Sequence, residues 1–405
     1  MKFGILRERK SPPDKRVVFS PSKLLEFKRL FPDAEIKVEA SDIRVFTDEQ
    51  YKELGIDVTE DVSDCDVLIG VKEVPIDALI PGKKYFFFSH TIKKQPYNQK
   101  MLQAVLDNDI TLYDHETVIN RDGKRLLGFG RYAGIVGTYN AFRAFCLKYD
   151  LHDLPKAESL TGKEELISRL KKLYLPPFKV VLTGHGKVGM GAKEILDAVK
   201  IKEVSINDFL TKSYDVPVYV HIDVLDYNRR KDGEPAIGNA EFFTGAEDFE
   251  SDFARFANAA DMFIAGHFHG NNAPDILTAE MLAGKDCKLK VVADISCDVA
   301  GPVACTLRSS TIAEPLYGYN PLTRQEVDVF HPAAVVVMAV DNLPCELPKD
   351  ASEGFGDMFL QHVIPAFFND DAHGILERAV IAEHGKLAPR FKYLDGYVKE
   401  NVPHT

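Results

Sequence analysis

The sequence lacks a paired cysteine motif, an excess of positive charge and any uninterrupted apolar stretch of membrane-spanning length. Its six cysteines are scattered, with neither C-x-x-C nor zinc-like spacing, so free thiols in a reducing compartment are expected. A net charge of −11 disfavours nucleic acid or an anionic membrane as the main partner, because both attract basic surfaces. The N-terminal residues carry no apolar targeting segment, which predicts a cytoplasmic protein.

The composition is that of a globular enzyme with two domains. At 405 residues the chain is too long for one ordinary hydrophobic core. Hydrophobic residues make up 45% of it and charged residues 27%, which is usual for an enzyme. Because the protein is acidic, an anionic ligand must meet local groups of positive charge.

A glycine-rich turn lies in the segment FKVVLTGHGKVGMGAKEILDAV, residues 178–199. Residues 180–182 are apolar and β-branched or aliphatic, as in a strand buried on both faces of a parallel sheet. Gly184, Gly186 and Gly189 follow at G-x-G-x-x-G spacing, and the apolar residues beyond them fall on one face of a helix. Such a turn suits a pyrophosphate at the helix N-terminus. We therefore expect a dinucleotide site, although a plain strand-to-helix turn is the alternative.

An acidic residue is expected to bind the adenosine ribose of this dinucleotide. Asp223 ends a strand predicted over 216–222, and such an acid favours NAD over NADP. It lies 34 residues beyond Gly189, whereas the usual offset is about 20, and we attribute the excess to an insertion at 202–215. Asp226 is a rival for this role. Arg229 and Arg230 could instead hold the 2′-phosphate of NADP, so NADP remains possible.

The N-terminal part predicts an α/β domain with a largely parallel sheet, because short strands alternate with helical patterns. Titratable residues follow three of the strands, where ligands of such sheets collect. They are Lys72 and Glu73, Ser89 and His90, and Asp114, His115 and Glu116. The expected strands cover 3–6, 35–38, 66–71, 85–88 and 111–113, and the expected helices 22–30, 48–54 and 99–107.

Two polar segments have two interpretations each. Residues 7–16 carry five cations and form either solvated surface or a carboxylate-binding loop. Residues 123–134, after a turn signal at Asp122-Gly123, form either a glycine-rich connection or a loop that brings Arg125 to a carboxylate. A helix over 135–149 and a helical linker over 151–177 are expected next.

The remaining sequence predicts strands at 261–266, 288–294 and 333–341, followed by a mostly helical tail at 350–399. Asp294 ends one of these strands and should face the cofactor. His267 and His269 lack an acidic or cysteine partner at ligand spacing, so no metal site is predicted.

Together these motifs resemble the alanine dehydrogenase and saccharopine dehydrogenase superfamily over nearly the whole chain. The blocks that carry the general resemblance are RVVFSP at 16–21, VKEVP at 71–75 and SHTIKKQ at 89–95. Those closer to the lysine-forming saccharopine dehydrogenases are LYDHE at 112–116, FGRYAG at 129–134 and DNLPCELP at 341–348.

The resemblance implies an α/β protein of two Rossmann-like domains with parallel sheets, separated by a ligand cleft. The substrate domain would comprise 1–135 and 347–405, and the dinucleotide-binding domain 136–346. Lys72 and His90 match the family's acid–base pair. Matches to substrate positions are Arg16, Gln95, Arg125 and Phe129, with Glu116 where a carboxylate tunes the lysine. The predicted cofactor site comprises Gly184, Gly186, Lys187, Gly189, Asp223, Lys124 and Asp294.

The activity implied is NAD-dependent oxidation of saccharopine to lysine and 2-oxoglutarate. Lys72, with its pKa lowered among charges, would act as base and His90 as second proton carrier. The expected partners are small amino acids and keto acids, and the oligomeric state stays open. Two alternatives are an alanine dehydrogenase-like enzyme and a non-catalytic dinucleotide-binding subunit like the soluble part of a transhydrogenase.

Overall fold

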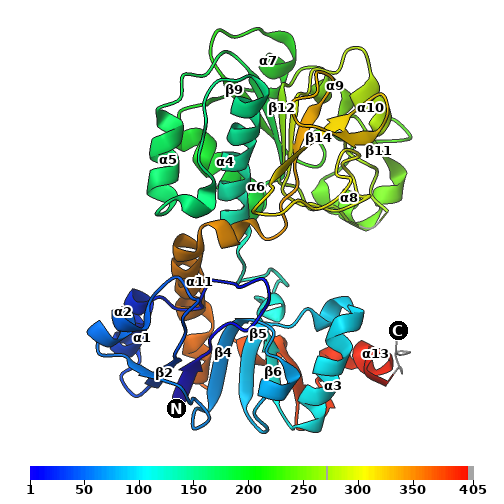
Figure 1. The fold of residues 1–405 in the computed structure, drawn as a ribbon. Helices are drawn as coiled ribbons and strands as arrows, with labels where there is room; N and C mark the ends of the chain where they lie inside the picture. The colour runs from blue at the N-terminus through cyan, green and yellow to red at the C-terminus, as the bar shows by residue number, and fades with distance from the viewer. Residues whose placement is uncertain (271, 400–405) are drawn as a thin grey trace. The chain divides into compact units, whose positions relative to one another are not determined.

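The computed structural model describes residues 1–270 and 272–399. The chain forms two compact units, each an α/β structure built on an eight-stranded sheet (Figure 1). The first unit combines Met1–Phe129 with the C-terminal segment that begins at Pro348, and the second comprises Gly130–Leu347. In the described part of the chain, no helix combines the length and apolar character that crossing a membrane requires.

Six neighbouring strands of the first unit run parallel, in the spatial order β3-β2-β1-β4-β5-β6. This is the order of a doubly wound nucleotide-binding fold, in which the strand order reverses between β1 and β4. The strands are β1 (Lys2–Ile5), β2 (Glu35–Glu39), β3 (Asp57–Thr59), β4 (Val67–Lys72), β5 (Lys84–Phe88) and β6 (Thr111–Asp114). The predicted positions of five of these six parallel strands are confirmed to within a residue or two, and β3 was missed.

The tail of the chain completes the first unit. Its helix α11 (Pro348–His362) packs on α1 (Pro21–Leu30), and β17 (Val380–Glu383) pairs antiparallel with β6. The prediction of a mostly helical tail therefore missed β17 and its partner β18 (Lys386–Leu387). The apolar run at residues 379–382, which supplies most of β17, is too short for periodicity to distinguish a strand from a helix. It becomes a strand because β6 offers it a sheet edge. The remaining helices are α2 (Asp48–Glu53), α3 (Gln99–Asp107), α12 (Ile375–Ala379) and α13 (Asp395–Lys399).

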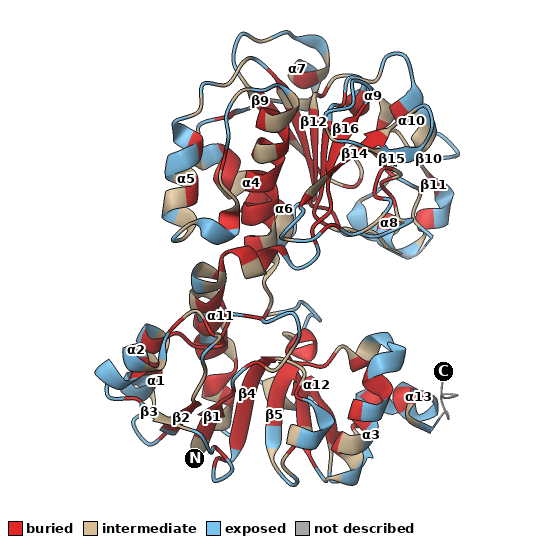
Figure 2. Cartoon of the chain, viewed as in Figure 1, coloured by how far each residue is buried: buried red, intermediate tan, exposed pale blue. Residues whose placement is uncertain are grey.

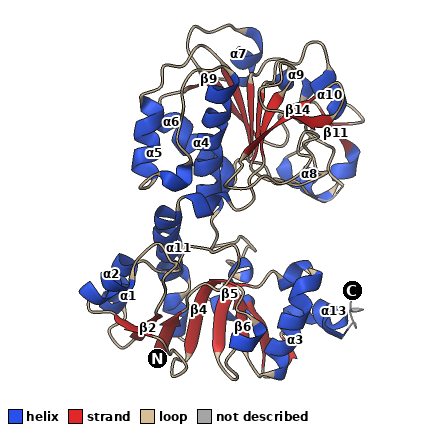
Figure 3. Ribbon diagram, in the orientation of Figure 1, coloured by secondary structure: helices blue, strands red, loops and turns tan. Residues whose placement is uncertain are grey.

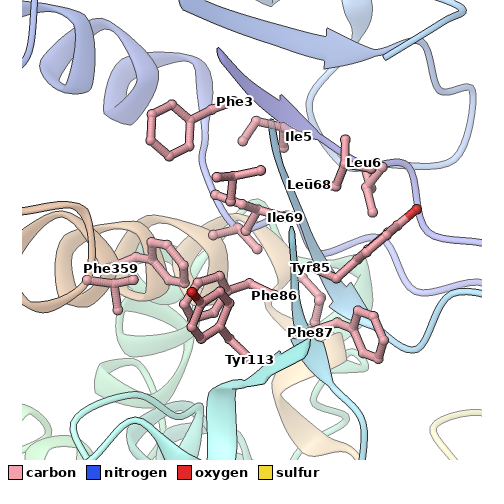
Figure 4. Close-up of a cluster of buried hydrophobic side chains, with 14 of the residues drawn as sticks. Phe3, Ile5, Leu6, Leu68, Ile69, Tyr85, Phe86, Phe87, Tyr113 and Phe359 are labelled. Atoms are coloured by element: carbon pink, nitrogen blue, oxygen red, sulfur yellow. The ribbon is translucent and has the colours of Figure 1, made fainter. Parts of the chain in front are cut away.

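Aromatic side chains on both faces of β5 fill the core of the first unit (Figure 4). Phe86 stacks on Tyr113 with ring centroids 4.5 Å apart, and Phe359 of α11 packs edge-on against Phe86 at 5.4 Å. Tyr85 and Phe87 point to the opposite face, since successive side chains alternate along a strand. Burial on both faces explains the continuous apolar sequence of this strand.

The sheet of the second unit has the order β8-β9-β7-β12-β13-β16-β14-β15. The run from β8 to β16 is parallel, whereas β14 and β15 add an antiparallel hairpin that the sequence did not predict. The α/β class with two mostly parallel sheets is confirmed (Figure 3). The strands are β7 (Lys179–Thr183), β8 (Lys202–Glu203), β9 (Val218–Ile222), β12 (Met262–Ala265), β13 (Val291–Asp294), β14 (Leu316–Asn320), β15 (Gln325–Val327) and β16 (Val335–Met338). A separate hairpin joins β10 (Asn228–Arg230) and β11 (Phe249–Ser251).

Two helices of the second unit touch backbone to backbone. A Cβ on Gly134 of α4 (Gly130–Lys148) would lie 2.0 Å from the carbonyl oxygen of Val188 in α6 (Lys187–Ala198). A Cβ on Gly191 would be equally close to the carbonyl oxygen of Arg131. The predicted helix at 135–149 thus begins one turn earlier, because this glycine-rich segment packs as helix. Figure 2 shows α4 and the strands largely buried and the outer helices more exposed.

The other predicted segments of the second unit are only partly helical. The linker expected to be helical over 151–177 is so at Ala157–Ser159 and in α5 (Lys163–Lys171). The insertion at 202–215 forms β8, which extends the sheet edge, and α7 (Ile206–Thr211). The remaining short helices are α8 (Asn239–Thr244), α9 (Ala254–Ala257) and α10 (Ala279–Ala283).

Candidate active site

Three neighbouring strands of the first unit end in the predicted titratable groups. Lys72 is the last residue of β4 and pairs with Phe88, the last residue of β5. The imidazole of His90 stacks on the Phe88 ring, with centroids 6.0 Å apart. Lys72 and His90 therefore lie at the same edge of one sheet, and Glu116 follows the adjacent strand β6.

Three side chains with nitrogen donors meet at the Glu116 carboxylate. Its carboxylate lies 3.1 Å from His90 Nδ1, from Lys93 Nζ and from Arg125 Nη2. Burial alone would raise the pKa of Glu116, but the His90 hydrogen bond and the charges of Lys93 and Arg125 lower it to about 2. The carboxylate is therefore ionised and can only accept, so Nδ1 of His90 carries the proton. In the neutral ring, Nε2 is then the basic nitrogen.

Asp114 holds the loop that presents Glu116. This buried carboxylate accepts hydrogen bonds from the backbone N–H of Ser89 at 2.9 Å and of Glu116 at 2.6 Å. It thereby ties the end of β5 to the end of β6. Asp114 thus serves the geometry of its neighbours, although the sequence offered it as a candidate for chemistry itself.

A buried ion pair occupies the loop after β1. Arg16 donates from Nε and Nη2 to the two oxygens of Asp14, at 3.0 and 2.6 Å, and its guanidinium lies 4.3 Å over the Phe129 ring. Burial would raise the pKa of Asp14, but Arg16 and the charge of Lys72 lower it. The polar segment 7–16 is thus built around a buried pair and is not simply solvated surface.

Sequence reasoning overlooked two residues of this group, Asp14 and Lys93. For Asp14 the signal was in the sequence, because an acid two residues before an arginine can form a local ion pair with it. Lys93 stood in a quoted motif without an assigned role, and its pairing with Glu116 depends on how two loops meet.

The other predicted substrate residue and one predicted cofactor residue lie in exposed turns of the first unit. Gln95 precedes the short helix Pro96–Asn98, and its carbonyl oxygen accepts from the Tyr397 hydroxyl. Lys124 lies in the tight turn whose Gly123 has φ 77°, next to the bridge that pairs Ile119 with Arg125. The turn signal at Asp122-Gly123 is confirmed.

The glycine turn of the second unit fits a phosphate group. Gly184 has φ 91°, and a Cβ on Gly189 would lie 1.7 Å from the carbonyl oxygen of Gly184, so both positions require glycine. A Cβ on Gly186 would meet nothing within 4 Å, which leaves open space beside the backbone. Gly186 is also the N-cap of α6, and no side chain caps that helix. The first N–H groups of α6, beginning at Lys187, therefore face a site suited to an anion.

Asp223 follows β9, where the ribose-binding acid was predicted. Its Oδ2 accepts from Asn239 Nδ2 at 2.6 Å and lies 3.6 Å from His185 Nδ1. The rival Asp226 instead accepts from the backbone N–H of Asp223 at 2.7 Å and closes the turn. The arginines considered for a 2′-phosphate pair with acids, Arg229 with Glu250 and Arg230 with Asp232 and Glu241.

Asp294, at the end of β13, is engaged within its own unit. Burial raises the pKa of its carboxyl, which accepts from the hydroxyls of Ser296 and Thr306, each at 2.6 Å. Across 1–270 and 272–399, no three His, Cys, Asp or Glu side chains gather as metal ligands would.

The fold and these sites define a class: two-unit α/β proteins with a dinucleotide-type glycine turn in one unit and titratable side chains gathered at the strand ends of the other, as in nicotinamide-dependent dehydrogenases. Two family models match the chain, the alanine dehydrogenase/PNT N-terminal domain at residues 4–136 and the C-terminal domain at residues 166–389. The chain therefore belongs to the alanine dehydrogenase/PNT family, and the resemblance found in its motifs is confirmed.

Similar proteins include an alpha-aminoadipic semialdehyde synthase of Arabidopsis thaliana, 28% identical over 98% of this chain and 42% of the relative. The chain thus spans less than half the length of that synthase. A saccharopine dehydrogenase (NAD+, L-lysine-forming) of Yarrowia lipolytica is 24% identical over 89% of this chain and 90% of the relative. Among solved structures, an L-alanine dehydrogenase has a TM-score of 0.64 at 18% identity, covering 98% of this chain and all of its own.

Proposed function

We propose that this protein catalyses the reversible NAD-dependent oxidation of saccharopine to L-lysine and 2-oxoglutarate. The observation that carries the proposal is the gathering of His90, Lys93 and Arg125 on Glu116 at the strand edge where β4 delivers Lys72. Saccharopine is a tricarboxylate with a secondary amine, so its enzyme needs cations for the carboxylates and proton carriers for the nitrogen. Lys93 and Arg125 bring positive charge to this edge of an acidic protein, and such charge attracts an anionic substrate.

The reaction requires proton transfers at each stage. Saccharopine, NAD+ and water give lysine, 2-oxoglutarate, NADH and a proton. The amine first loses its proton, which we assign to the Lys72 amine as base. The glycine turn at Gly184, Gly186 and Gly189 would hold NAD+, which would supply the acceptor for the hydride that leaves the carbon beside that nitrogen. Water then adds to the imine, and the carbinolamine collapses with proton transfer through Nε2 of His90, whose ring Glu116 holds by Nδ1.

The cations of the first unit are assigned to the substrate carboxylates. Arg125 presents a planar guanidinium at an exposed position, and the exposed Lys93 lies on the same oxygen of Glu116. Arg16 is already paired with Asp14, so we assign it the role of shaping the floor of the site with Phe129. Gln95 is proposed as a further substrate contact on the resemblance of its motif alone.

We assign the dinucleotide to the glycine turn of the second unit, with Gly184, Gly186 and Gly189 at the pyrophosphate. NAD is preferred to NADP because Asp223 carries a negative charge where a 2′-phosphate would lie. The pairing of Arg229 and Arg230 with acids supports this preference. The roles of Lys124, Lys187 and Asp294 at the cofactor stay predictions.

The proposal is tested by mixing the protein with NADH, lysine and 2-oxoglutarate and following the absorbance of NADH. Consumption of NADH that depends on both lysine and 2-oxoglutarate is expected. Oxidation of NADH with pyruvate and ammonia alone would instead favour an alanine dehydrogenase, the enzyme to which the chain is similar in fold. NADH binding without oxidation of any substrate would favour a dinucleotide-binding subunit.

Arg125→Ala is expected to distinguish a large from a small substrate. Loss of a guanidinium that binds a carboxylate costs about 2–4 kcal/mol, so kcat/KM for saccharopine should fall roughly 30- to 700-fold. Lys93 remains on Glu116, so the His90 ring keeps its orientation. Steady-state assays on saccharopine and alanine provide the measurement. Arg121→Ala, an exposed arginine of the same turn, is the control, and equal losses on both substrates would contradict the assignment.

A further inference from the structure

Strand β4 contains an irregularity immediately before Lys72. Ile69 pairs with Phe86 of β5, but the next pair joins Lys72 with Phe88. Between these two pairs β4 advances by three residues and β5 by only two. Such a β-bulge leaves backbone groups unpaired and turns the following side chain to a new direction. The bulge comprises Gly70 and Val71.

One carboxylate accepts hydrogen bonds from the N–H group of the second bulge residue and from that of the residue after the bulge. Glu8 Oε1 accepts from the backbone N–H of Val71 at 2.7 Å, and Oε2 accepts from that of Lys72 at 2.8 Å. Glu8 lies in the segment after β1, beside β4, where the strand order of this sheet reverses. The side chain is buried, and burial raises its pKa to about 7. A single side chain thus accepts hydrogen bonds from both N–H groups.

The carbonyl of the bulge is held from the opposite side. His115 Nε2 lies 2.8 Å from the carbonyl oxygen of Gly70, and since that oxygen can only accept, Nε2 carries the proton. The ring is wholly buried, edge-on to Phe88 at 4.8 Å and to Phe355 at 5.0 Å. Burial lowers the pKa of His115 to about 4, so the imidazole is neutral. The contacts with these two aromatic rings fix the position of the imidazole.

We propose that Glu8 and His115 are positioning residues that clamp the bulge at Gly70–Val71 and so set the direction of the Lys72 side chain. This inference rests on the proposed role of Lys72 as base. It goes beyond that role because neither residue is assigned contact with the substrate or the dinucleotide. The clamp acts on the N–H groups from the segment after β1 and on the carbonyl from the segment after β6, so that the strand end cannot turn about its own axis.

The first test compares two buried carboxylates. Glu8→Gln keeps the shape of the side chain but puts an NH2 group against one backbone N–H, which breaks one arm of the clamp. A displacement of about 1 Å can cost on the order of 100-fold in rate, so kcat should fall by roughly 10- to 100-fold. KM and the Kd for NADH should stay unchanged. Glu39→Gln is the matched control, because Glu39 is also buried and accepts from the backbone N–H of Arg7 at 3.0 Å.

A second pair of variants addresses the other arm. His115→Phe keeps an aromatic ring in the cage but removes the donor to the Gly70 carbonyl, and the same loss of kcat is expected. His115→Gln restores an N–H donor near the position of Nε2 and should recover part of the rate. Recovery by glutamine would not follow if His115 only filled space.

A readout without turnover separates this inference from the proposed function. At a pH above the raised pKa of Glu8, the rate at which an acylating reagent labels Lys72 is measured by mass spectrometry, with the exposed Lys100 of α3 as internal reference. The Lys72 rate should change severalfold in Glu8→Gln and His115→Phe, while that of Lys100 stays constant. If both variants fold, as shown by a cooperative thermal unfolding transition and a circular dichroism spectrum like that of the wild type, and if Lys72 labelling and kcat match the wild type, the clamp is wrong. Absence of saccharopine oxidation by the wild type would overturn the function alone, since the labelling would still decide the clamp.

Discussion

Lys72→Met is expected to abolish turnover while the protein still binds NADH. Methionine keeps most of the side-chain volume but cannot take up a proton, and a positioned acid–base group typically contributes about 10²–10⁴-fold in rate. The dinucleotide is assigned to the second unit, whereas Lys72 belongs to the first, so the binding step should not change. Steady-state kinetics with saccharopine and fluorescence titration with NADH measure the two effects separately.

The control for this substitution is Lys100→Met, which changes an exposed lysine of α3 and should leave kcat unchanged. Its free energy of unfolding should change by no more than about 0.5 kcal/mol, as is usual for surface positions. The pKa values of two neighbouring carboxyl groups provide a further check on the Lys72→Met variant. The charge of Lys72 lowers the pKa of Asp14 and of Glu73, so the variant should show a higher pKa for both carboxyl groups. Turnover of Lys72→Met near the wild-type rate would show that the base lies elsewhere.

Gly189→Ala is expected to abolish dinucleotide binding and to destabilise the protein. Its new Cβ would lie 1.7 Å from the carbonyl oxygen of Gly184, which is backbone and cannot yield without moving the turn. Forcing an extra carbon into a packed position costs about 1–3 kcal/mol or more. Because the same displacement moves the N–H groups at the start of α6, the Kd for NADH should rise beyond measurement.

A second glycine separates binding from stability. Gly186→Ala places its Cβ in open space, so the unfolding midpoint should not change, yet the methyl group would occupy the room assigned to the pyrophosphate. Loss of NADH binding without loss of stability is therefore expected. Gly396→Ala, an open glycine in α13 of the other unit, is the control for both measurements. NADH binding by Gly186→Ala at wild-type strength would contradict the placement of the dinucleotide.

Local pattern predicted most strands of this protein because they are buried on both faces. Runs such as Tyr85–Phe88 and Val180–Leu182 are apolar throughout and bounded by polar turns, which is sufficient to recognise a central parallel strand. The same reasoning missed β14, β15 and β17. These strands are antiparallel additions at sheet edges, where the neighbour that pairs with them decides their conformation.

In the candidate site, too, some features followed from local sequence and others only from the folded structure. The positions of Lys72, His90 and Glu116 at strand ends followed from the strands themselves. Pairing of Glu116 with Arg125 and Lys93 did not, because it depends on where two loops of the folded unit meet.

By itself, the sequence determined the α/β class, the glycine turn and the residue types available for acid–base chemistry, since these depend on local periodicity and on chemical identity. Only the tertiary structure decided that β4 is bulged before Lys72 and that Glu8 and His115 hold the bulge from opposite sides. The physical reason is that backbone N–H and carbonyl groups left unpaired in a buried strand must find partners. Those partners come from the segments that follow β1 and β6, tens of residues away along the chain, and no local pattern encodes which residues will reach the bulge.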